Sequence, residues 1–457
     1  MVSSAATFSS PSEEAFRRSI ADRTAVVGVV GLGYVGLPLA MAFAGAGFSV
    51  YGVDLDEHKI QRLRRGESYI LDVERSTVAE AVSAERFHAE TRFEVLAKAD
   101  VIFVCVPTPF DRAKNPDLSY IVNAASGIAP VLRRGQLIIL ESTTYPGTTE
   151  EILIPILEQS GLKAGSDFHV AFSPERIDPG NRRFGIENTP KVVGGVDLES
   201  TERAALVLEQ VVAKGKVHRV STPRAAELTK LLENTFRAVN IALVNELAVL
   251  CDRMGIDVWE VIEAAKTKPY GFMPFYPGPG VGGHCIPVDP YYLSWKAREF
   301  DFSTKFIELA AETNRQMPFF AVAKLRRLLH ERGAALRGAR VLALGAAFKK
   351  DIDDARNSAA IRVIEILRHE GADVAYHDPF VPAIALRDGI YGEGDMSERL
   401  TSVDLTNEAV AAADCVLILV GHSRIDYRGV VDAARFVFDV VNATQDVAPA
   451  SGKVARI

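Results

Sequence analysis

The chain has 457 residues, 48% of them hydrophobic, which is enough apolar surface for about three domain-sized cores. Its 52 basic and 59 acidic residues give a net charge of −7, so no chain-wide attraction to nucleic acid or to an anionic membrane is expected. An anionic ligand must therefore be held by local groups.

The N-terminal stretch has no basic start followed by an apolar core, so it does not resemble a signal peptide. We expect residues 1–21 to form a flexible arm. Residues 25–53 carry no charge and are long enough to span a membrane, but seven glycines and a proline interrupt them. This pattern instead predicts an apolar strand, a glycine turn, a small-residue helix and a second strand, as in a βαβ unit buried on both faces.

The glycine turn GLGYVG follows the strand VVGVV and precedes the helix, as in a dinucleotide-binding fingerprint. Its first glycine permits the turn, its second lets backbone N–H groups approach a pyrophosphate, and its third lets helix and strand pack closely. Asp54 ends the next strand, where its carboxylate would accept the ribose hydroxyls of NAD and repel the extra phosphate of NADP; the following Leu55 supplies no cation. A purely structural turn is the alternative. The residues expected to bind NAD here are Gly31, Gly33, Tyr34, Val35, Gly36 and Asp54.

The alternation of strands and helices continues, which predicts an NAD-binding Rossmann domain over residues 22–219. The segment ADVIFVCVPTP predicts a strand and a loop, and GQLIILESTTYPGTTEEILIPIL predicts a strand, a loop and a helix capped near Thr148. Ligands bind at strand ends in such sheets, although hydroxyl groups there also cap helices and form turns. The further cofactor or substrate neighbours expected at these ends are Pro107, Thr108, Ser142 and Thr143.

A long helix is predicted after this domain, because Pro223 stands near its start, Gly255 follows its end and leucines recur at helical spacing. Lys230 and Asn234 are four residues apart on it and share a face. A lysine on a helix is usually solvated, but Lys-x-x-x-Asn beside a dinucleotide domain can orient a substrate hydroxyl and its proton. We expect a central helical and catalytic-loop domain over residues 220–333, with the helix as a homodimer interface.

The segment PGPGVGGHCIPVDP surrounds Cys285 with glycines, so a bulky substrate can approach the sulfur. A thiolate adds to an aldehyde to give a thiohemiacetal; loss of a hydride leaves a thioester, from which water releases a carboxylate. A lysine would stabilise the oxyanion, and a carboxylate would position water. A buried structural cysteine is one alternative, and a metal cluster of His284, Cys285 and Asp289 is another. No further cysteine or histidine lies at metal-ligand spacing, so we expect no metal.

The other cysteines, Cys105, Cys251 and Cys415, show no paired spacing. We therefore expect no disulfide and a reducing, cytoplasmic setting. Cys105 lies inside an apolar strand, where an inert core residue is expected.

Residues 334–457 repeat the plan of the first domain, which predicts a second Rossmann-like domain. An interval of 69 residues recurs, from Gly31 to Asp100 and from Gly345 to Asp414. Where the first copy has its glycine fingerprint, the second has GAAFKKDIDDARNSAA, whose Lys349, Lys350 and Arg356 suit a phosphorylated ligand; ordinary solvated charges are the alternative. The predicted fold class is α/β, with two Rossmann-like domains of parallel sheets joined by a long central helix.

Six motifs, in this order over nearly the whole chain, resemble the UDP-glucose/GDP-mannose dehydrogenase family: GLGYVG, ESTTYPG, SPERIDPGN, ELTKLLENT, PGPGVGGHCIPVDP and GAAFKKDIDDARNSA. The resemblance implies an enzyme that uses NAD to oxidise the hydroxymethyl group of a nucleotide sugar in two steps, with the second domain binding the nucleotide. It implies Cys285 as the nucleophile, Lys230 as the lysine that stabilises an oxyanion or handles a proton, Asn234 and Asp289 as supports of water and proton transfer, and Thr143 and Glu175 as organisers of water. The substrate contacts that it implies are Glu175, Lys230, Asn234, Tyr276, Gly282 and Lys349, and Arg356 is implied to reach the cofactor or the nucleotide.

Departures from the family pattern bear on the substrate. UDP-glucose dehydrogenases typically follow Pro-Glu with a loop resembling FLREG, whereas RIDPGN here replaces the second acidic residue by Pro179. They also usually have serine, asparagine or tyrosine before the nucleophile and lysine before the aspartate, where this chain has His284 and Val288. GGHCIPVDPYYL, preceded by KPYGFMPFYPG, is more similar to the branch that acts on UDP-N-acetylhexosamines, above all UDP-N-acetylglucosamine.

The predicted reaction is therefore the oxidation of UDP-N-acetylglucosamine to UDP-N-acetylglucosaminuronate, which the resemblance places in surface polysaccharide synthesis. UDP-glucose and UDP-N-acetylmannosamine are the alternative substrates; the mannosamine branch tends to have alanine where Pro287 stands. A β-hydroxyacid dehydrogenase would need neither Cys285 nor a second nucleotide domain. A catalytically silent regulatory protein that binds NAD or UDP is disfavoured by the complete set of nucleophile, lysine and carboxylate.

Overall fold

The computed structural model describes residues 11–70, 72–111, 115–178, 181, 183–213, 215–387, 396–447 and 452–457. They form two compact units: Met1–Glu233 with Trp295–Phe300, and Asn234–Ser294 with Asp301–Ile457. The segment predicted as a central domain, residues 220–333, is divided between these units. Pro179 lies outside the described residues.

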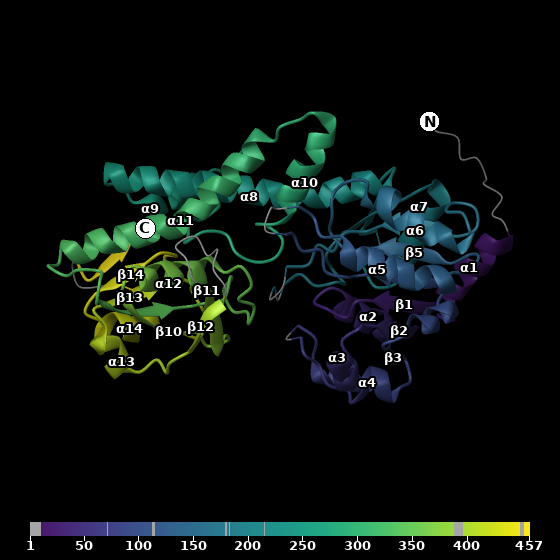
Figure 1. The fold of residues 1–457 in the computed structure, drawn as a ribbon, viewed down its shortest axis with the longest axis horizontal. Coiled ribbons are helices and arrows are strands. Elements are labelled where there is room, and N and C mark those ends of the chain that lie inside the picture. Colours follow the sequence, from purple (N-terminus) through teal and green to yellow (C-terminus); the bar gives the residue numbers. More distant parts are fainter. Residues whose placement is uncertain are drawn as a thin grey trace. The chain divides into compact units, whose positions relative to one another are not determined.

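The first unit is built on an eight-stranded sheet in the order β3-β2-β1-β4-β5-β6-β7-β8 (Figure 1). Its strands are β1 (Val26–Val30), β2 (Ser49–Val53), β3 (Phe87–Glu90), β4 (Val101–Val104), β5 (Leu137–Leu140), β6 (His169–Phe172), β7 (Lys191–Gly195) and β8 (Val217–Arg219). The central strands are apolar and buried because helices cover both faces. The predicted parallel sheet is confirmed, with one exception: β6 and β7 pair antiparallel.

Helices of the first unit include α1 (Pro11–Ala21), α2 (Gly36–Gly45), α3 (Glu57–Arg64), α4 (Arg75–Ser83), α5 (Ser119–Ile128), α6 (Ile154–Leu157) and α7 (Leu198–Leu208). The expectation of a flexible arm is wrong for residues 11–21, because they form α1 against α7. Phe16 and Ile20 are buried there, and the Arg203 guanidinium lies 4.8 Å from the Phe16 ring centroid. These two apolar residues, one helical turn apart, form the buried face by which α1 packs on the unit. Residues 1–10 lie outside the described residues.

The predicted long helix is confirmed as α8 (Pro223–Met254), which contributes to both units. Its first turns are fixed to the first unit by Glu227, whose carboxylate accepts hydrogen bonds from Thr149 N (2.9 Å) and Thr149 Oγ1 (2.6 Å). Glu227 thus satisfies the start of the π-helical turn η3 (Thr149–Leu153), where the sequence predicted a cap near Thr148. The Thr148 hydroxyl instead donates to Tyr145 O.

The second unit contains a five-stranded parallel sheet in the order β10-β9-β13-β14-β15, and a separate antiparallel pair. The strands are β9 (Arg340–Leu344), β10 (Asp373–His377), β13 (Cys415–Ile418), β14 (Val437–Asp439) and β15 (Val454–Arg456), with β11 (Ala383–Arg387) pairing with β12 (Met396–Thr401). The helices are α9 (Val258–Lys266), α10 (Asp289–Ala297), α11 (Lys305–His330), α12 (Ala359–His369), α13 (Asn407–Ala412) and α14 (Tyr427–Ala433). No helix among the described residues is both long and apolar enough to cross a membrane.

Equivalent hydrogen bonds confirm the repeat between the two sheets. The order β2-β1-β4-β5 in one unit matches β10-β9-β13-β14 in the other. The carboxylate of Asp100 accepts from Val26 N at 2.9 Å, and that of Asp414 accepts from Arg340 N at 2.9 Å. Both aspartates therefore fasten the start of the first strand of their sheet.

Candidate functional site

The glycine turn between β1 and α2 leaves open space at one position. Gly31 has φ +90°, and a Cβ on Gly36 would lie 1.9 Å from the Gly31 carbonyl oxygen, so both glycines are required by the fold itself. A Cβ on Gly33 would meet nothing within 4 Å. The turn is therefore open to solvent at Gly33, which is the arrangement that a pyrophosphate at a helix start would require. Val35 is half-buried at the N-cap of α2, and the Tyr34 side chain is exposed.

Asp54, at the end of β2, is held so that its carboxylate borders this turn. It accepts hydrogen bonds from Leu32 N (2.9 Å) and Asp56 N (3.0 Å), and its side chain is 12% exposed. Lys59 Nζ on α3 lies 3.3 Å from Asp54 Oδ2. The neighbouring Leu55 supplies no cation, but Lys59, which the sequence analysis did not find, is brought back to Asp54 by the first turn of α3. The turn and the carboxylate together fit the pyrophosphate and ribose of a dinucleotide.

The loops after β4 and β5 are tied together at the same edge of the sheet. Thr108 Oγ1 donates to Thr143 O at 2.6 Å, and Ser142 Oγ donates to Val106 O at 2.8 Å. Pro107 is exposed beside them. Two of the predicted hydroxyl groups thus hold the loops together, while the adjacent Thr144 Oγ1 is buried with no hydrogen-bond partner among the described residues.

Lys230 and Glu175 are brought together in the first unit. Lys230 is 8% exposed, and its ammonium donates to the Glu175 backbone carbonyl at 2.6 Å. Burial raises the pKa of the Glu175 carboxyl, but the Lys191 ammonium and the N–H groups of Ile177 and Arg176 outweigh it, so that its pKa is below the ordinary value. Glu175 is therefore held as an anion that can accept hydrogen bonds.

Two residues of this cluster, Lys191 and Glu141, were missed by the sequence analysis. Lys191 Nζ lies 2.7 Å from Glu175 Oε2 and 3.1 Å from Glu141 Oε1. The available signal was a lysine that opens the apolar strand KVVGG and a glutamate that follows LIIL. Glu141 opens the motif ESTTYPG, but Lys191 belongs to none of the motifs, so only the pairing of strands shows that they meet.

In the second unit, Asn234 and Asp289 are brought together next to Cys285. Asn234 Nδ2 donates to Asp289 Oδ2 at 2.5 Å, and both residues are buried. Asp289 begins α10, and its backbone N–H donates to Cys285 O at 2.8 Å. Cys285 itself is exposed, which contradicts the alternative of a buried structural cysteine. The thiol is thus accessible and its backbone is fixed to a helix start.

The glycines before Cys285 are packed against the loop after β9. A Cβ on Gly282 would lie 2.8 Å from Phe348 Cβ, and Gly283 N donates to Arg356 O at 3.2 Å. The Arg356 guanidinium is exposed and forms an ion pair with Asp354 at 2.6 Å. Burial, followed by repulsion from Arg356, lowers the pKa of His284, so its imidazole is uncharged at neutral pH.

Two further predicted substrate contacts, Tyr276 and Lys349, lie in the second unit, and Lys349 directly follows Phe348 of the loop that packs against the glycines. Tyr276 is 43% exposed, its hydroxyl donates to Glu263 Oε1 at 2.9 Å, and its ring is stacked with Trp259. Lys349 is half-buried in the loop after β9. Among the residues that the structure describes, no group of three or more His, Cys, Asp or Glu side chains is arranged to hold a metal ion.

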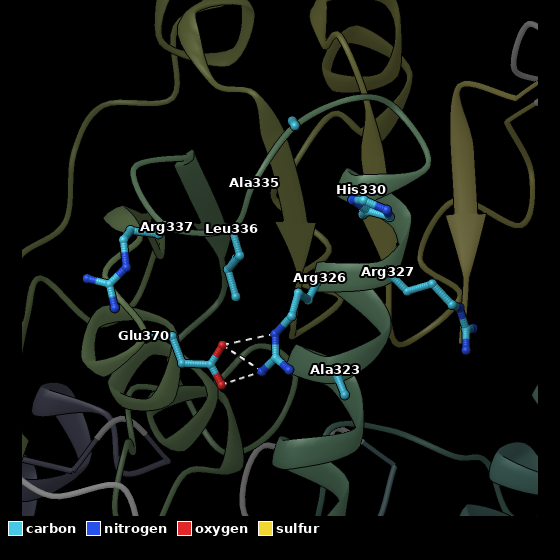
Figure 2. Close-up of a pocket in the computed structure, with 9 residues that line it drawn as sticks. Ala323, Arg326, Arg327, His330, Ala335, Leu336, Arg337 and Glu370 are labelled. Carbon is cyan, nitrogen blue, oxygen red and sulfur yellow. Dashed lines mark hydrogen bonds and ion pairs between the residues drawn. The ribbon is translucent and has the colours of Figure 1, made fainter.

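A hollow beside the C-terminal part of α11 is separate from all of these residues. Figure 2 shows Arg326 directed at Glu370 within it, at 2.5–3.2 Å, while Arg327 and Arg337 point away from this ion pair. The cations therefore do not converge on a common ligand position. We assign no binding role to this hollow.

Known proteins resemble the chain along most of its length. Models of the UDP-glucose/GDP-mannose dehydrogenase family match it as an NAD binding domain (residues 25–212), a central domain (224–316) and a UDP binding domain (342–446). The UDP-N-acetyl-D-glucosamine 6-dehydrogenase of Pseudomonas aeruginosa is 39% identical over 404 residues, which are 88% of this chain and 92% of the relative. The UDP-N-acetyl-D-mannosamine dehydrogenase of Pyrococcus horikoshii is 39% identical over 356 residues, 78% and 84% of the two chains. The structure of a UDP-D-ManNAc dehydrogenase from Pyrococcus horikoshii superposes with a TM-score of 0.84 at 33% identity, covering 94% of this chain and 99% of that one.

Proposed function

Because the chain belongs to the UDP-glucose/GDP-mannose dehydrogenase family, we propose that this NAD-dependent UDP-sugar dehydrogenase oxidises the hydroxymethyl group of UDP-N-acetylglucosamine to a carboxylate. The product is UDP-N-acetylglucosaminuronate. One observation carries the proposal: an exposed Cys285 in a glycine-rich loop, beside the hydrogen-bonded pair of Asn234 and Asp289. A single alcohol oxidation needs no such thiol, whereas oxidation to the acid requires the aldehyde to be captured.

The residues of the chain divide the chemistry between them. Lys230 would stabilise the oxyanion that forms at the sugar carbon, and the Cys285 thiolate would add to the aldehyde to give a thiohemiacetal. Loss of a second hydride leaves a thioester; water adds to its carbonyl carbon, the carbon–sulfur bond breaks, and the carboxylate leaves with the thiolate restored. Asn234 and Asp289 would support the proton transfers of these steps, and Glu175 with Thr143 would hold the water.

The first unit would supply the oxidant. The Gly33 opening would hold the pyrophosphate of NAD and Asp54 would hold its ribose; the cofactor would supply the hydride acceptor of each oxidation, so two NAD would be reduced per sugar. Pro107, Thr108 and Ser142 would border it. Arg356 lies in the other unit, and its contact with the cofactor or the nucleotide remains a prediction.

UDP-N-acetylglucosamine is proposed over its epimer on sequence grounds. The Pseudomonas relative named for this sugar and the Pyrococcus relative named for the mannosamine epimer are equally identical to the chain. Pro287 follows the glucosamine branch, and the uncharged His284 stands where UDP-glucose enzymes usually have serine, asparagine or tyrosine. Tyr276, Gly282 and Lys349 are proposed to contact this substrate.

A homodimer through α8 is also proposed. Five large apolar side chains of this helix are 41–60% exposed and fall within a sector of about 60° at 100° per residue: Phe236, Leu243, Leu247, Leu250 and Met254. A second copy of the same helix is the partner that such a self-complementary stripe fits. Sedimentation of the full chain should give twice the monomer mass, and Leu243→Glu should give the monomer. A wild-type monomer at micromolar concentration would contradict the dimer.

The function is tested by the stoichiometry of NADH formation. Purified enzyme should form two NADH for each UDP-N-acetylglucosamine consumed, and turn over UDP-glucose and UDP-N-acetylmannosamine more slowly. Preference for either of these sugars would overturn the substrate assignment. One NADH per sugar would overturn the thioester route, and no NADH with any of the three would favour the silent, regulatory alternative.

A second measurement isolates the thiol. Cys285→Ser should bind NAD as the wild type does but form no acid, because a serine hydroxyl does not replace the thiolate. Cys251→Ser, at a half-buried cysteine of the same unit, is the matched control and should keep acid formation. Wild-type acid production by Cys285→Ser would remove Cys285 from the mechanism.

A further inference from the structure

A buried ion cluster of Glu141, Lys191 and Glu175 lies at one edge of the sheet in the first unit. Lys191 is 2% exposed, and its ammonium donates to Glu175 Oε2 at 2.7 Å and to Glu141 Oε1 at 3.1 Å. The side chain of Glu141 has no exposure, and that of Glu175 has 11%. Burying three charged groups is costly, and stability alone gives a weak reason for it, since apolar replacements of buried ion pairs are often neutral or stabilising.

The antiparallel junction between β6 and β7 explains how Lys191 reaches this edge. Ala171 pairs with Gly195 and Phe172 with Gly194, so the same register continued beyond β6 puts Lys191 opposite Glu175. Ligands of such sheets bind at the carboxyl ends of the parallel strands, and Glu141 and Glu175 follow β5 and β6 there. A parallel β7 would have placed its first residue at the far edge.

The cluster leaves Glu175 with little freedom. Its Oε1 accepts the backbone N–H groups of Arg176 and Ile177, both at 2.6 Å, and its Oε2 accepts the Lys191 ammonium. Three of about four acceptor positions are therefore filled, and the remaining one can take a water. Glu141 Oε2 has no hydrogen-bond partner among the described residues, and burial raises the pKa of Glu141 against the opposing Lys191 charge.

The same strip of backbone seats Lys230. The Glu175 carbonyl accepts the Lys230 ammonium at 2.6 Å, and the next residue, Arg176, forms an ion pair with Glu233 at 2.7 Å. Lys230 and Glu233 are three residues apart on α8, so one face of the helix contacts both Glu175 and Arg176. A change in the Glu175 side chain therefore moves the carbonyl on which Lys230 rests.

We propose that Lys191 is a positioning residue of the oxidation: its buried ammonium, shared with Glu141, fixes the Glu175 carboxylate and thereby the carbonyl that seats Lys230. The proposal rests on the proposed function, in which Glu175 holds water and Lys230 stabilises an oxyanion. It adds that Glu175 works as a fixed anion, with its charge maintained by a residue that touches neither substrate nor cofactor.

The ionisation of Glu175 tests the proposal without any substrate. Infrared titration of the full chain, with Glu175 identified by the band lost in Glu175→Gln, should show it titrating below its ordinary range in the wild type. Lys191→Met should raise this titration by about one to three pH units, because the buried carboxylate loses its cation. Lys191→Met/Glu141→Gln should show the same shift, because the raised pKa of Glu141 leaves its carboxyl uncharged where Glu175 titrates. An unchanged Glu175 titration in Lys191→Met overturns the proposal.

Glu141→Gln alone covers the case in which Lys191→Met does not fold. It keeps the Lys191 ammonium beside Glu175, so Glu175 should still titrate below its ordinary range, while a carboxyl that titrates above its ordinary range should be lost. A Glu175 titration within or above the ordinary range, or no loss of a raised carboxyl, would contradict the cluster. Lys324→Met is the matched control: it removes another buried lysine, 2.8 Å from Asp252, and should leave Glu175 unchanged.

The kinetic arm separates this proposal from the proposed function. With the preferred UDP-sugar, the acid limb of the kcat profile should move to higher pH in Lys191→Met, with kcat falling more than KM changes, and should move as far in the double variant. A merely structural role would lower activity at all pH values without moving the limb. If the wild type forms no NADH with any sugar, the proposed function fails, whereas the infrared titration still decides whether Lys191 fixes Glu175.

Discussion

The two Rossmann-like regions share one backbone plan. They differ in whether the turn after the first strand, and the aspartate beside this turn, are exposed or buried. In each, the first strand ends in a glycine with positive φ, Gly31 (+90°) or Gly345 (+94°). The next N–H donates to the aspartate that ends the neighbouring strand, Asp54 (2.9 Å) or Asp378 (2.7 Å). Asp54 remains 12% exposed, whereas the side chain of Asp378 has no exposure.

Asp378 is sealed by five donors. Its carboxylate accepts hydrogen bonds from His422 Nε2 and from the backbone N–H groups of Ala346, Ala347, Phe380 and Val381. His422 Nδ1 accepts from Asp351 N, so the ring hydrogen must be on Nε2, facing Asp378. The same carboxylate position is thus partly open in the first region and an internal hydrogen-bond acceptor in the second. The lysines of the loop after β9 remain the predicted ligand contacts of the second region.

The turns after β1 and β9 also differ in that the first is open and the second is filled. Counting from the first glycine, Gly33 corresponds to Ala347, which is fully buried. The space that is open at Gly33 in the first region is therefore occupied by a methyl group in the second. Mutations that fill the open positions of the first region, or that unseal the buried ones of the second, should therefore make the two regions behave more alike.

The largest effect is expected from Gly33→Ala, which gives the first turn the residue of the second. The fold should be kept, because a Cβ at Gly33 meets nothing within 4 Å. NAD affinity measured by calorimetry should fall about 10- to 100-fold, since charge-assisted hydrogen bonds from the turn to the pyrophosphate are lost. Ala347→Gly is the matched control and should leave NAD binding unchanged. Undiminished affinity in Gly33→Ala would place the pyrophosphate elsewhere.

A smaller effect, on stability, is expected from Asp378→Asn. The amide cannot satisfy five donors, and the loss corresponds to about 2 kcal/mol of unfolding free energy for the second unit. Asp54→Asn should cost less than about 0.5 kcal/mol, because that side chain is partly exposed. Amide hydrogen exchange in β9 and β10, compared with β1 and β2, measures each unit separately. Equal losses in both variants would break the contrast between an open and a sealed carboxylate.

Much of the fold and of the NAD site could be predicted from sequence, because their signals are local. The family, the α/β class, the NAD cofactor and the long helix α8 are confirmed. The turn glycines and Asp54 lie at fixed spacing along one βαβ unit, and the repeat is visible because Asp100 and Asp414 keep the same interval from their turns. Such features need no knowledge of distant pairings.

The remainder depends on which distant segments pair. Lys191 meets Glu175 only because β7 pairs antiparallel with β6, and the sequence KVVGG does not indicate the direction of its strand. Lys59 reaches Asp54 through the first turn of α3, and α1 is held by Phe16 and Ile20 against α7, where composition suggested an arm. The catalytic roles of the site residues stay predictions, since they depend on substrate and cofactor.

A change with pH sharpens the contrast at Asp378. Burial raises its pKa, but the hydrogen bonds from His422, Ala346 and Ala347 outweigh this and lower the pKa to about 2. The stability that Asp378 contributes is therefore present above its ordinary value of 3.8 and is lost as pH falls toward 2. The difference in unfolding free energy between wild type and Asp378→Asn should shrink by about 1 kcal/mol between pH 4 and pH 3. Urea denaturation measures this difference at each pH. A constant difference over the interval would mean that Asp378 is not ionised in the folded protein.

The smallest expected effect is on the choice between NAD and NADP, and it concerns Lys59, the cation beside the partly exposed Asp54. Its ammonium lies 3.3 Å from Asp54 Oδ2, so removing that carboxylate leaves a cation where the 2′-phosphate of NADP would lie. Asp54→Ala should therefore raise the ratio of NADP to NAD use, and Asp54→Ala/Lys59→Ala should lower it again by about fivefold, because a partly exposed ion pair contributes about 1 kcal/mol. Lys98→Ala, which removes a lysine stacked on Tyr51 of the same strand, is the matched control in the Asp54→Ala background and should leave the ratio unchanged. If Asp54→Ala and Asp54→Ala/Lys59→Ala use NADP equally, the choice of cofactor depends on repulsion by Asp54 and not on attraction by Lys59.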